Sequence, residues 1–323
     1  MKSVVDIFVE LGARLRGFGD DDASREVMRH AVEQNLWFTE RDIVHAVDAI
    51  REEMLDGAKL TAWLAHYTPV SVPQRVAVIM AGNIPLVGFF DLLCVVCSGH
   101  KLYVKPSSKD KVLMEYIIDL LRDIETEIPI YKYNSEDRYD MAIATGGDEA
   151  NAYFRQHFEG TRHLLRGSRH SVAVLDGTES DAELQGLLSD ITSYSGLGCR
   201  SVSMLFLPED CELRLPKSKA QNPKLRNNIA QRRALYTLQG KPYKDYGAFL
   251  ALEATAFSTS LAEIAICRYR DIKEVREWIA EHREELQCVV SHADIEGCVP
   301  FGRAQYPTLT DYADGVDSMK FLL

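Results

Sequence analysis

The chain has 323 residues, of which 46% are hydrophobic, and its formal net charge is −11. This length and apolar content suffice for one large core or for two domains, and the negative charge argues against general binding to nucleic acid. Seven cysteines at irregular spacing argue against a disulfide framework and favour a reducing, cytoplasmic compartment. We expect neither a signal peptide nor a membrane span.

The first part of the chain, residues 1–66, is predicted to be helical. Thr39 followed by Asp42 is typical of a helix N-cap, and apolar residues recur at helical spacing after it. Further along, the apolar run 86–98 suits a buried helix.

From residue 74 short β-branched runs alternate with helical patterns. Strands are predicted at 75–80, 101–104, 141–144 and 171–175, with a helix over 113–124. Strand and helix alternating at this pitch favour a parallel α/β sheet with helices on both faces.

A second α/β section is predicted from about residue 199. Its strands are expected at 202–207, 263–268 and 288–291, with a charged helix over 271–286. Two α/β domains are therefore expected, with their boundary between residues 177 and 199.

A basic segment, residues 213–244, departs from the acidic background: it contains nine Lys or Arg and no Asp or Glu. One interpretation is a solvated helix and loop, with the helix over 228–238. The other is a surface for a phosphorylated group, such as the nucleotide end of coenzyme A.

The most informative motif is Ser195-Gly196-Leu197-Gly198-Cys199-Arg200, followed by an apolar run. Glycines remove side-chain bulk, so a substrate carbonyl can approach both the Cys199 sulfur and nearby backbone N–H groups. Cys199 is therefore interpreted as a nucleophile, with Arg200 or a helix terminus as candidates for lowering the pKa of its thiol. A tight turn is the structural alternative.

Upstream, residues 80–86 read Met-Ala-Gly-Asn-Ile-Pro-Leu at the end of a predicted strand. Gly82 permits a tight turn, and proline is favourable in a first helical turn. Asn83 offers a neutral amide donor at the carboxyl end of a parallel strand, where α/β proteins bind ligands. The alternative role for Asn83 is a helix N-cap.

Two more strand ends carry candidate ligand contacts. Lys105 ends the strand in Tyr103-Val104-Lys105-Pro106-Ser107-Ser108-Lys109, where it can reach ribose or phosphate groups or remain a surface lysine. Gly146 and Gly147 precede a predicted helix, whose N-terminal N–H groups can approach a pyrophosphate. The acidic residues at 148 and 149 suit a helix first turn equally well.

Taken in order, these residues resemble the aldehyde dehydrogenase superfamily from about residue 74 onward. Asn83 stands where that family has the Asn-x-Pro that supplies an oxyanion donor, and Cys199 occupies the place of its nucleophile. Lys105-Pro106-Ser107 matches its Lys-Pro-Ser, whose lysine contacts the adenosine ribose. Pro300-Phe301-Gly302 is similar to the family's late Pro-Phe-Gly.

The resemblance implies further cofactor contacts and a domain plan. Gly146 and Gly147 would lie beside the pyrophosphate, and Gly167, in the stretch that matches the family's Glu-Leu-Gly-Gly, would also contact the cofactor. The implied fold is aldehyde-dehydrogenase-like, with two doubly wound, Rossmann-like α/β domains and an N-terminal helical segment. Residues 1–190 would hold the helices and the nucleotide-binding domain, 191–300 the catalytic domain, and 301–323 a segment returning to the first domain.

Two departures from the family pattern refine the expected chemistry. The glutamate that activates water in hydrolytic members is missing from residues 164–169, so an acyl-cysteine would hydrolyse slowly and favour reduction or acyl transfer. NAD-preferring members also have a glutamate for the ribose 2′-hydroxyl where this chain has Ser108, followed by Lys109. These two residues, together with Ser107, can accommodate a 2′-phosphate, which favours NADPH while leaving NADH open.

The motifs are most similar to those of the fatty-acyl-CoA reductases related to the bacterial luminescence enzyme. That branch implies NADPH-dependent reduction of an acyl-CoA or other acyl thioester to an aldehyde through an acyl-cysteine. An acyl-activating or acyl-transferring partner protein and a homo-oligomer remain open. So do two alternatives: a cysteine-dependent acyltransferase or thioesterase without nicotinamide, and a catalytically idle partner subunit.

Other candidates carry less weight. Cys94 and Cys97 form a CxxC in an apolar helix without a second ligand pair, so core packing is expected and no metal site is predicted. His163 and His170 are interpreted as surface or hydrogen-bonding residues. No glutamate is assigned to the nicotinamide ribose.

Overall fold

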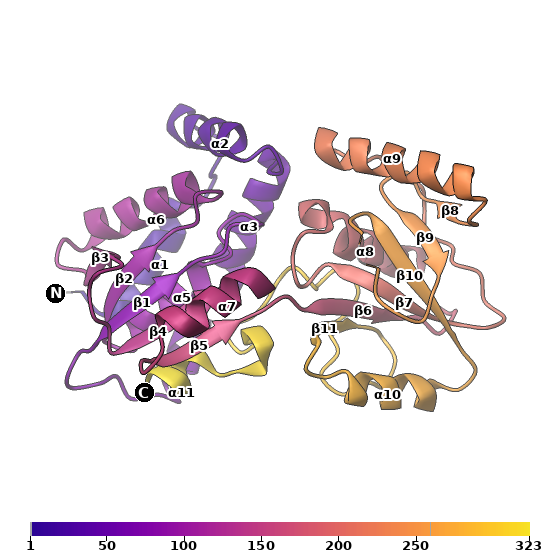
Figure 1. Cartoon of the computed structure of the whole chain (residues 1–323). Helices are drawn as coiled ribbons and strands as arrows, with labels where there is room; N and C mark the ends of the chain where they lie inside the picture. The colour runs from indigo at the N-terminus through magenta and orange to yellow at the C-terminus, as the bar shows by residue number, and fades with distance from the viewer. Residues whose placement is uncertain (1, 259) are drawn as a thin grey trace. The chain divides into compact units, whose positions relative to one another are not determined.

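The computed structural model describes every residue except Met1 and Thr259. It divides into two compact units, shown in Figure 1: unit 1 comprises residues 1–168 and 307–323, and unit 2 comprises residues 169–306. The expected borders, after residues 190 and 300, differ from these limits. The first border moves because strand β6 (His170–Val174) pairs with two strands of the second sheet. No helix among the described residues has both the length and the apolar content needed to cross a bilayer.

Unit 1 begins with the expected helices, which are α1 (Val4–Arg14), α2 (Asp22–Gln34), α3 (Glu40–Glu53) and α4 (Gly57–Leu64). Each starts where a Ser, Thr or Asp side chain accepts a backbone N–H from the first turn, which satisfies one of the unpaired donors at a helix start. The predicted N-cap is confirmed, because Thr39 Oγ1 accepts from the Asp42 N–H at 3.1 Å.

The first sheet is fully parallel and has the order β3-β2-β1-β4-β5. Its strands are β1 (Arg75–Ile79), β2 (Lys101–Lys105), β3 (Ile130–Lys132), β4 (Met141–Thr145) and β5 (Arg162–Arg166). The strand order reverses between β1 and β4, and in open α/β sheets ligands bind beyond the carboxyl ends at such a reversal. The sequence motifs at 80–86 and 145–147 leave the sheet at this point.

Alternate residues of each strand bury opposite faces of this sheet. Val76 and Val78 of β1 join the main core with helices α1 to α6, whereas Ala77 and Ile79 join a smaller cluster with Phe158 after α7. The helices that complete the layers are α5 (Phe89–Cys97), α6 (Lys111–Ile124), α7 (Asp148–His157) and the C-terminal α11 (Ser318–Leu322). Helix α11 contacts α5, so the last residues of the chain close the core of unit 1.

The second sheet has the order β11-β6-β7-β10-β9-β8 and is parallel except for β8. Besides β6 it contains β7 (Val202–Pro208), β8 (Lys244–Asp245), β9 (Leu250–Glu253), β10 (Glu263–Tyr269) and β11 (Leu286–Val290). The two-residue β8 forms one edge. At the other edge β11 is followed by a single parallel bridge between Val290 and Val299.

Three helices accompany this sheet: α8 (Asp181–Thr192), α9 (Pro223–Gln239) and α10 (Ile272–Glu281). Figure 1 shows α8 and α10 on opposite sides of the strands. Helix α9 begins five residues before the predicted start at 228, because Asn222 caps it and Pro223 occupies its first turn. Helix α10 ends at Glu281, before the predicted helix end at residue 286, and strand β11 begins at Leu286 instead. The fold class expected from the sequence is confirmed.

Candidate functional site

The loop that carries Asn83 leaves β1 at the strand reversal of the first sheet. Asn83 is exposed and lies in a bend, and helix α5 begins only at Phe89 with Gly88 at its N-cap. Asn83 is therefore not the cap of that helix, which was the structural alternative for this residue. Leu86, in the same turn, has a φ of 56°, a conformation that costs a non-glycine residue free energy and is enriched at functional sites.

Asp110, which the sequence interpretation missed, holds this turn. Its Oδ2 accepts the Leu86 N–H at 2.8 Å, and the residue is only 1% exposed. Its Oδ1 has no hydrogen-bond partner among the described residues. Burial therefore raises the pKa of the Asp110 carboxyl well above its usual range. Asp110 occupies the N-cap position of α6 but makes no capping bond, so its position in the sequence concealed its role.

The Asn83 loop packs directly against the loop that follows β2. A Cβ built on Gly82 would lie 2.6 Å from the Cβ and the Oγ of Ser107. Gly82 has no positive φ, so glycine is needed here for close approach and not for the turn that the sequence suggested. The two motifs, far apart in the chain, are thus brought together in unit 1.

Lys105 ends β2 and lines a cavity of about 480 Å³ between the ends of β2 and β3 and helix α6. The charged residues around this cavity are Lys105, Lys111, Glu115, Asp119, Arg122 and Lys132. Lys111 pairs with Glu115, and Arg122 with Asp119, so Lys105 and Lys132 leave the cavity with net positive charge. Ser108 and Lys109 are exposed in the adjoining loop.

The three glycines expected beside a cofactor have different surroundings. A Cβ on Gly146 would lie 2.7 Å from Ala150 Cβ, so helix packing already requires this glycine. Gly147 is exposed and open, at the N-terminus of α7. Gly167 lies beyond β5, where a Cβ would meet Asn151 Nδ2 at 3.4 Å. Of the three, Gly147 best fits close approach by a ligand.

The stretch that lacks the expected glutamate has a structural role instead. Arg166 donates to Asp91 of α5 at 2.5 and 2.7 Å and to Ser318 Oγ of α11 at 2.7 Å. Arg166 and Asp91 are each 5% exposed. The guanidinium therefore compensates a buried carboxylate and ties β5 to two helices.

Cys199 lies in unit 2, in the segment between α8 and β7, and is partly buried. The chain enters this segment through three consecutive residues with positive φ, namely Tyr194 at 53°, Ser195 at 58° and Gly196 at 75°. Two of these are not glycine, and each such residue costs on the order of 1 kcal/mol or more. The folded unit thus maintains a strained backbone immediately before the cysteine.

The residues around Cys199 are fixed by neighbouring segments. Ser171 Oγ of β6 donates to the Cys199 carbonyl at 2.8 Å. Arg200 Nε donates to the Ala304 carbonyl at 2.5 Å, and Gln305 donates to Ser201 Oγ at 3.3 Å. We call the segment that supplies the last two contacts, residues 291–305, the strap. The Arg200 contacts join the cysteine segment to the strap and to Cys288 of β11.

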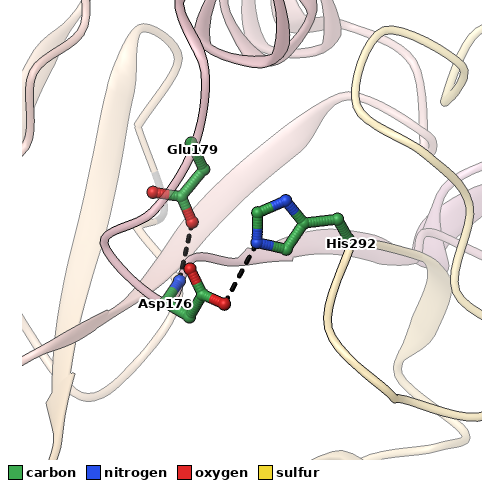
Figure 2. A group of neighbouring side chains, drawn as sticks. All are labelled: Asp176, Glu179 and His292. Atoms are coloured by element: carbon green, nitrogen blue, oxygen red, sulfur yellow. Dashed lines mark hydrogen bonds and ion pairs between the residues drawn. The ribbon is translucent and has the colours of Figure 1, made fainter.

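Asp176, Glu179 and His292 lie at the carboxyl ends of β6 and β11 with ligand atoms within 4.8 Å of one another (Figure 2). His292 Nε2 is 3.1 Å from Asp176 Oδ2, and His292 Nδ1 is 2.6 Å from Glu183 Oε1. Glu179 Oε1 accepts the Asp176 N–H at 2.6 Å. Because both ring nitrogens face carboxylates, the pKa of His292 is raised. These contacts describe an ion-paired histidine, and we assign no metal to the group.

The remaining candidates are structural. Cys94 and Cys97 are buried in the core of unit 1, and burial raises the pKa of both thiols, as expected for packing residues. In the basic segment Arg232 pairs with Glu263, and Arg233 with Asp245. Acidic groups outside the segment therefore neutralise part of its charge, which supports the interpretation as an ordinary helix and loop.

Comparisons with known proteins agree on family and fold. A family model described as acyl-CoA reductase (LuxC) matches residues 48–231, more than half of the chain. Long-chain acyl-protein thioester reductase 2 from Photobacterium leiognathi is 27% identical over 146 residues, which cover 40% of this chain and 30% of that relative. The match thus spans less than a third of the relative's length.

Solved structures agree with the fold class. Aldehyde dehydrogenase 21 from Physcomitrella patens, in complex with succinate, has a TM-score of 0.60 at 13% identity, covering 91% of this chain and 73% of that one. An engineered glycolyl-CoA reductase with bound NADP+ has a TM-score of 0.59 at 11% identity, covering 91% and 78%. At these identities the likeness shows the fold alone. Since the family match runs from α3 through Cys199 into α9, the chain belongs to the acyl-CoA reductase (LuxC) family.

Proposed function

We propose that this protein reduces an acyl thioester to an aldehyde, with Cys199 as the acyl acceptor. The observation that carries the proposal is the strained, glycine-containing segment before Cys199. Residues 199–201, which follow the strained residues, are held by hydrogen bonds with Ser171, Ala304 and Gln305. A cysteine used only for packing needs neither the strain nor these anchors, whereas a nucleophile needs a fixed direction of attack. Family membership supports the same reaction class.

In the proposed reaction the Cys199 sulfur attacks the thioester carbonyl carbon, and the thiol of the donor leaves with a proton as the acyl-cysteine forms. The Asn83 carboxamide supplies a hydrogen-bond donor to the developing oxyanion. Removing one such donor typically lowers kcat by about 10²–10³-fold. The turn held by Asp110 and the close contact of Gly82 with Ser107 support this role, because they fix the backbone around Asn83.

We further propose NADPH as the reductant, which supplies hydride when it is bound. The cavity beside Lys105 fits the adenosine part of such a cofactor in its position beyond the carboxyl ends of β2 and β3 and in its net positive charge. In the adjoining loop Ser107, Ser108 and Lys109 carry no negative charge, and the two carboxylates of the cavity, Glu115 and Asp119, are paired with Lys111 and Arg122. Gly147 leaves the N-terminus of α7 open, which suits the approach of a pyrophosphate.

The acyl donor is proposed to be acyl-CoA or an acylated protein. The Photobacterium relative is named for an acyl-protein thioester substrate, so both donors belong in the assay. Reaction in the cytoplasm is consistent with the seven cysteines, which form no disulfide in the part of the chain that the structure describes.

The test is single-turnover labelling with a radioactive acyl-CoA, followed by addition of NADPH. Wild type should become labelled on the peptide that contains Cys199 and should release labelled aldehyde when NADPH is added. Cys199→Ser should lose both signals, with Cys211→Ser as the control because Cys211 is partly exposed but lies elsewhere. Labelling that survives in Cys199→Ser contradicts an acyl-enzyme intermediate on Cys199. Labelling of wild type without release of aldehyde favours an acyltransferase.

A further inference from the structure

Helix α8 presents one face to the strap. Residues 183, 186 and 190 are spaced i, i+3 and i+7, which places them on the same side of a helix. Each makes a different kind of contact with the strap, and the strap ends beside the residues that follow Cys199. The helix, the strap and the cysteine segment therefore form one connected structure within unit 2.

The first two contacts dock the strap on the helix. His292 is ion-paired with Glu183 at 2.6 Å. One turn further on, a Cβ built on Gly186 would lie 2.8 Å from both the Gly302 nitrogen and the Phe301 carbonyl carbon. Backbone atoms cannot move aside as a flexible side chain can, so glycine at position 186 lets the strap lie directly on the helix.

The third contact is a carboxylate that accepts two backbone N–H groups. Asp190 Oδ2 accepts from Gly302 at 2.6 Å, and Asp190 Oδ1 accepts from Ala304 at 3.0 Å. Asp190 is 1% exposed, so neither bond can be exchanged for a bond to bulk water without opening the structure. Bonds from N–H groups to a charged acceptor are also stronger than neutral ones.

The strap passes this restraint to the cysteine segment. Ala304 is held at both ends, since its N–H binds Asp190 and its carbonyl accepts from Arg200. Gln305, the next residue, donates to Ser201 Oγ. Because Arg200 and Ser201 directly follow Cys199, a displacement of residues 304 and 305 would change the orientation of the Cys199 side chain.

We infer that Asp190 is a positioning residue, which fixes the strap through two backbone N–H groups and, through the strap, the orientation of Cys199. This inference rests on the proposed function only in taking Cys199 as the acyl acceptor.

The protonation state of Asp190 then controls the restraint. Burial raises the pKa of Asp190 to about 6, while the N–H groups of Gly302 and Ala304 and the nearby Arg200 act in the opposite direction. Once protonated, one carboxyl oxygen becomes a donor, so the group no longer serves as a double acceptor. At the other end of the strap, Glu183 and Asp176 raise the pKa of His292, so the imidazolium keeps its charge as the pH falls. The acid-sensitive element is thus Asp190.

The experiment compares wild type with Asp190→Asn, which keeps the shape of the side chain but accepts through only one atom. Acylation is measured in single turnovers with acyl-CoA between pH 5 and pH 8. We expect wild type to exceed the variant at least tenfold at pH 7.5, with the ratio approaching one below pH 6. Asp181→Asn, an exposed change on the same helix, should follow wild type at every pH. A ratio that stays constant with pH overturns the inference, because a merely structural loss has no reason to follow the titration of Asp190.

A second measurement is independent of acyl chemistry. Hydrogen–deuterium exchange of residues 195–201 and 302–304, corrected for intrinsic pH dependence, should be at least fivefold faster in Asp190→Asn at pH 7.5. Gly186→Ala, which leaves Asp190 in place and displaces the strap, should show the same faster exchange. If wild type is not acylated, the proposed function fails while the exchange data still decide the positioning role. Unchanged exchange in both variants refutes it.

Discussion

The two units bury a carboxylate beside each proposed reacting loop, but they treat its charge differently. In unit 1 Asp110 receives one N–H bond, and burial raises the pKa of its carboxyl well above the usual range. In unit 2 Asp190 receives two N–H bonds and faces Arg200, and its pKa rises only to about 6. Burial raises the pKa of both carboxyls, and in unit 2 the second N–H bond and the nearby Arg200 oppose that rise.

The difference lies in the donors that each buried carboxyl receives. Asp91 provides a third case, in which the guanidinium of Arg166 binds both carboxylate oxygens. Bonds from N–H groups and a nearby cation favour the charged form of a buried carboxyl, and Asp190 receives more of them than Asp110. The loop around Asn83 is therefore supported by a carboxyl that accepts one N–H bond, and the strap beside Cys199 by a carboxyl that accepts two.

The largest expected effect comes from removing the strongest of these partners. Arg166→Leu leaves Asp91 buried without a cation and should lower the free energy of unfolding of unit 1 by about 3–5 kcal/mol, measured by urea denaturation. The exposed Arg29, which pairs with two surface glutamates, is the control, and Arg29→Leu should cost less than about 1 kcal/mol. The double variant Asp91→Leu with Arg166→Leu should recover part of the loss. Equal losses for the two single arginine variants would show that the buried pair carries no special stabilisation.

The next effect is the pH dependence that Asp190 of unit 2 contributes. The pKa of Asp190 is raised to about 6 from 3.8 because burial outweighs its hydrogen bonds. Although the anion holds the strap locally, the global free energy of unfolding is therefore highest while Asp190 is protonated, below pH 3.8, and falls as the pH rises to about 6. At 1.36 kcal/mol per pKa unit the loss is about 3 kcal/mol. The free energy of unfolding of wild type minus that of Asp190→Asn should fall by this amount between pH 4 and pH 7. A difference that does not vary with pH would mean that Asp190 titrates normally.

The smallest effect concerns Asp110 of unit 1. Because the raised pKa of Asp110 makes its folding less favourable as pH rises, Asp110→Asn should be at least as stable as wild type at pH 7. Asp110→Ala, which leaves the Leu86 N–H without its acceptor, should be about 1–3 kcal/mol less stable than Asp110→Asn. Hydrogen exchange at Leu86 separates the two variants. If Asp110→Asn is less stable than wild type at pH 7, the pKa of Asp110 is not raised and the comparison between the units fails.

Much of the architecture could be predicted because local patterns coincide with the final packing. The strands at 75–80 and 202–207 are mainly apolar, as strands buried on both faces require, and each appears within a residue of its predicted limits. The three-residue β3 and the polar β5 lack that signal, so only pairing with neighbours reveals them.

The site was predictable at the level of motifs but not of their supports. Asn83, Lys105 and Cys199 stand out because glycine or proline accompanies each. Asp110 and Asp190 give no such signal, because each acts on a backbone N–H more than twenty residues away. An acidic residue at a helix start or on a helix face is ordinary in a sequence. Only burial and a distant partner distinguish these two from the many solvated carboxylates of this chain.

The edges of the second sheet have a consequence for handling the protein. One edge ends in the two-residue β8, and the other is covered where Val299 pairs with Val290. An uncovered strand edge recruits other chains into intermolecular sheets. A deletion that shortens residues 291–299 would expose β11 to such pairing, so trimmed forms of the chain should aggregate at concentrations where the intact one stays dispersed.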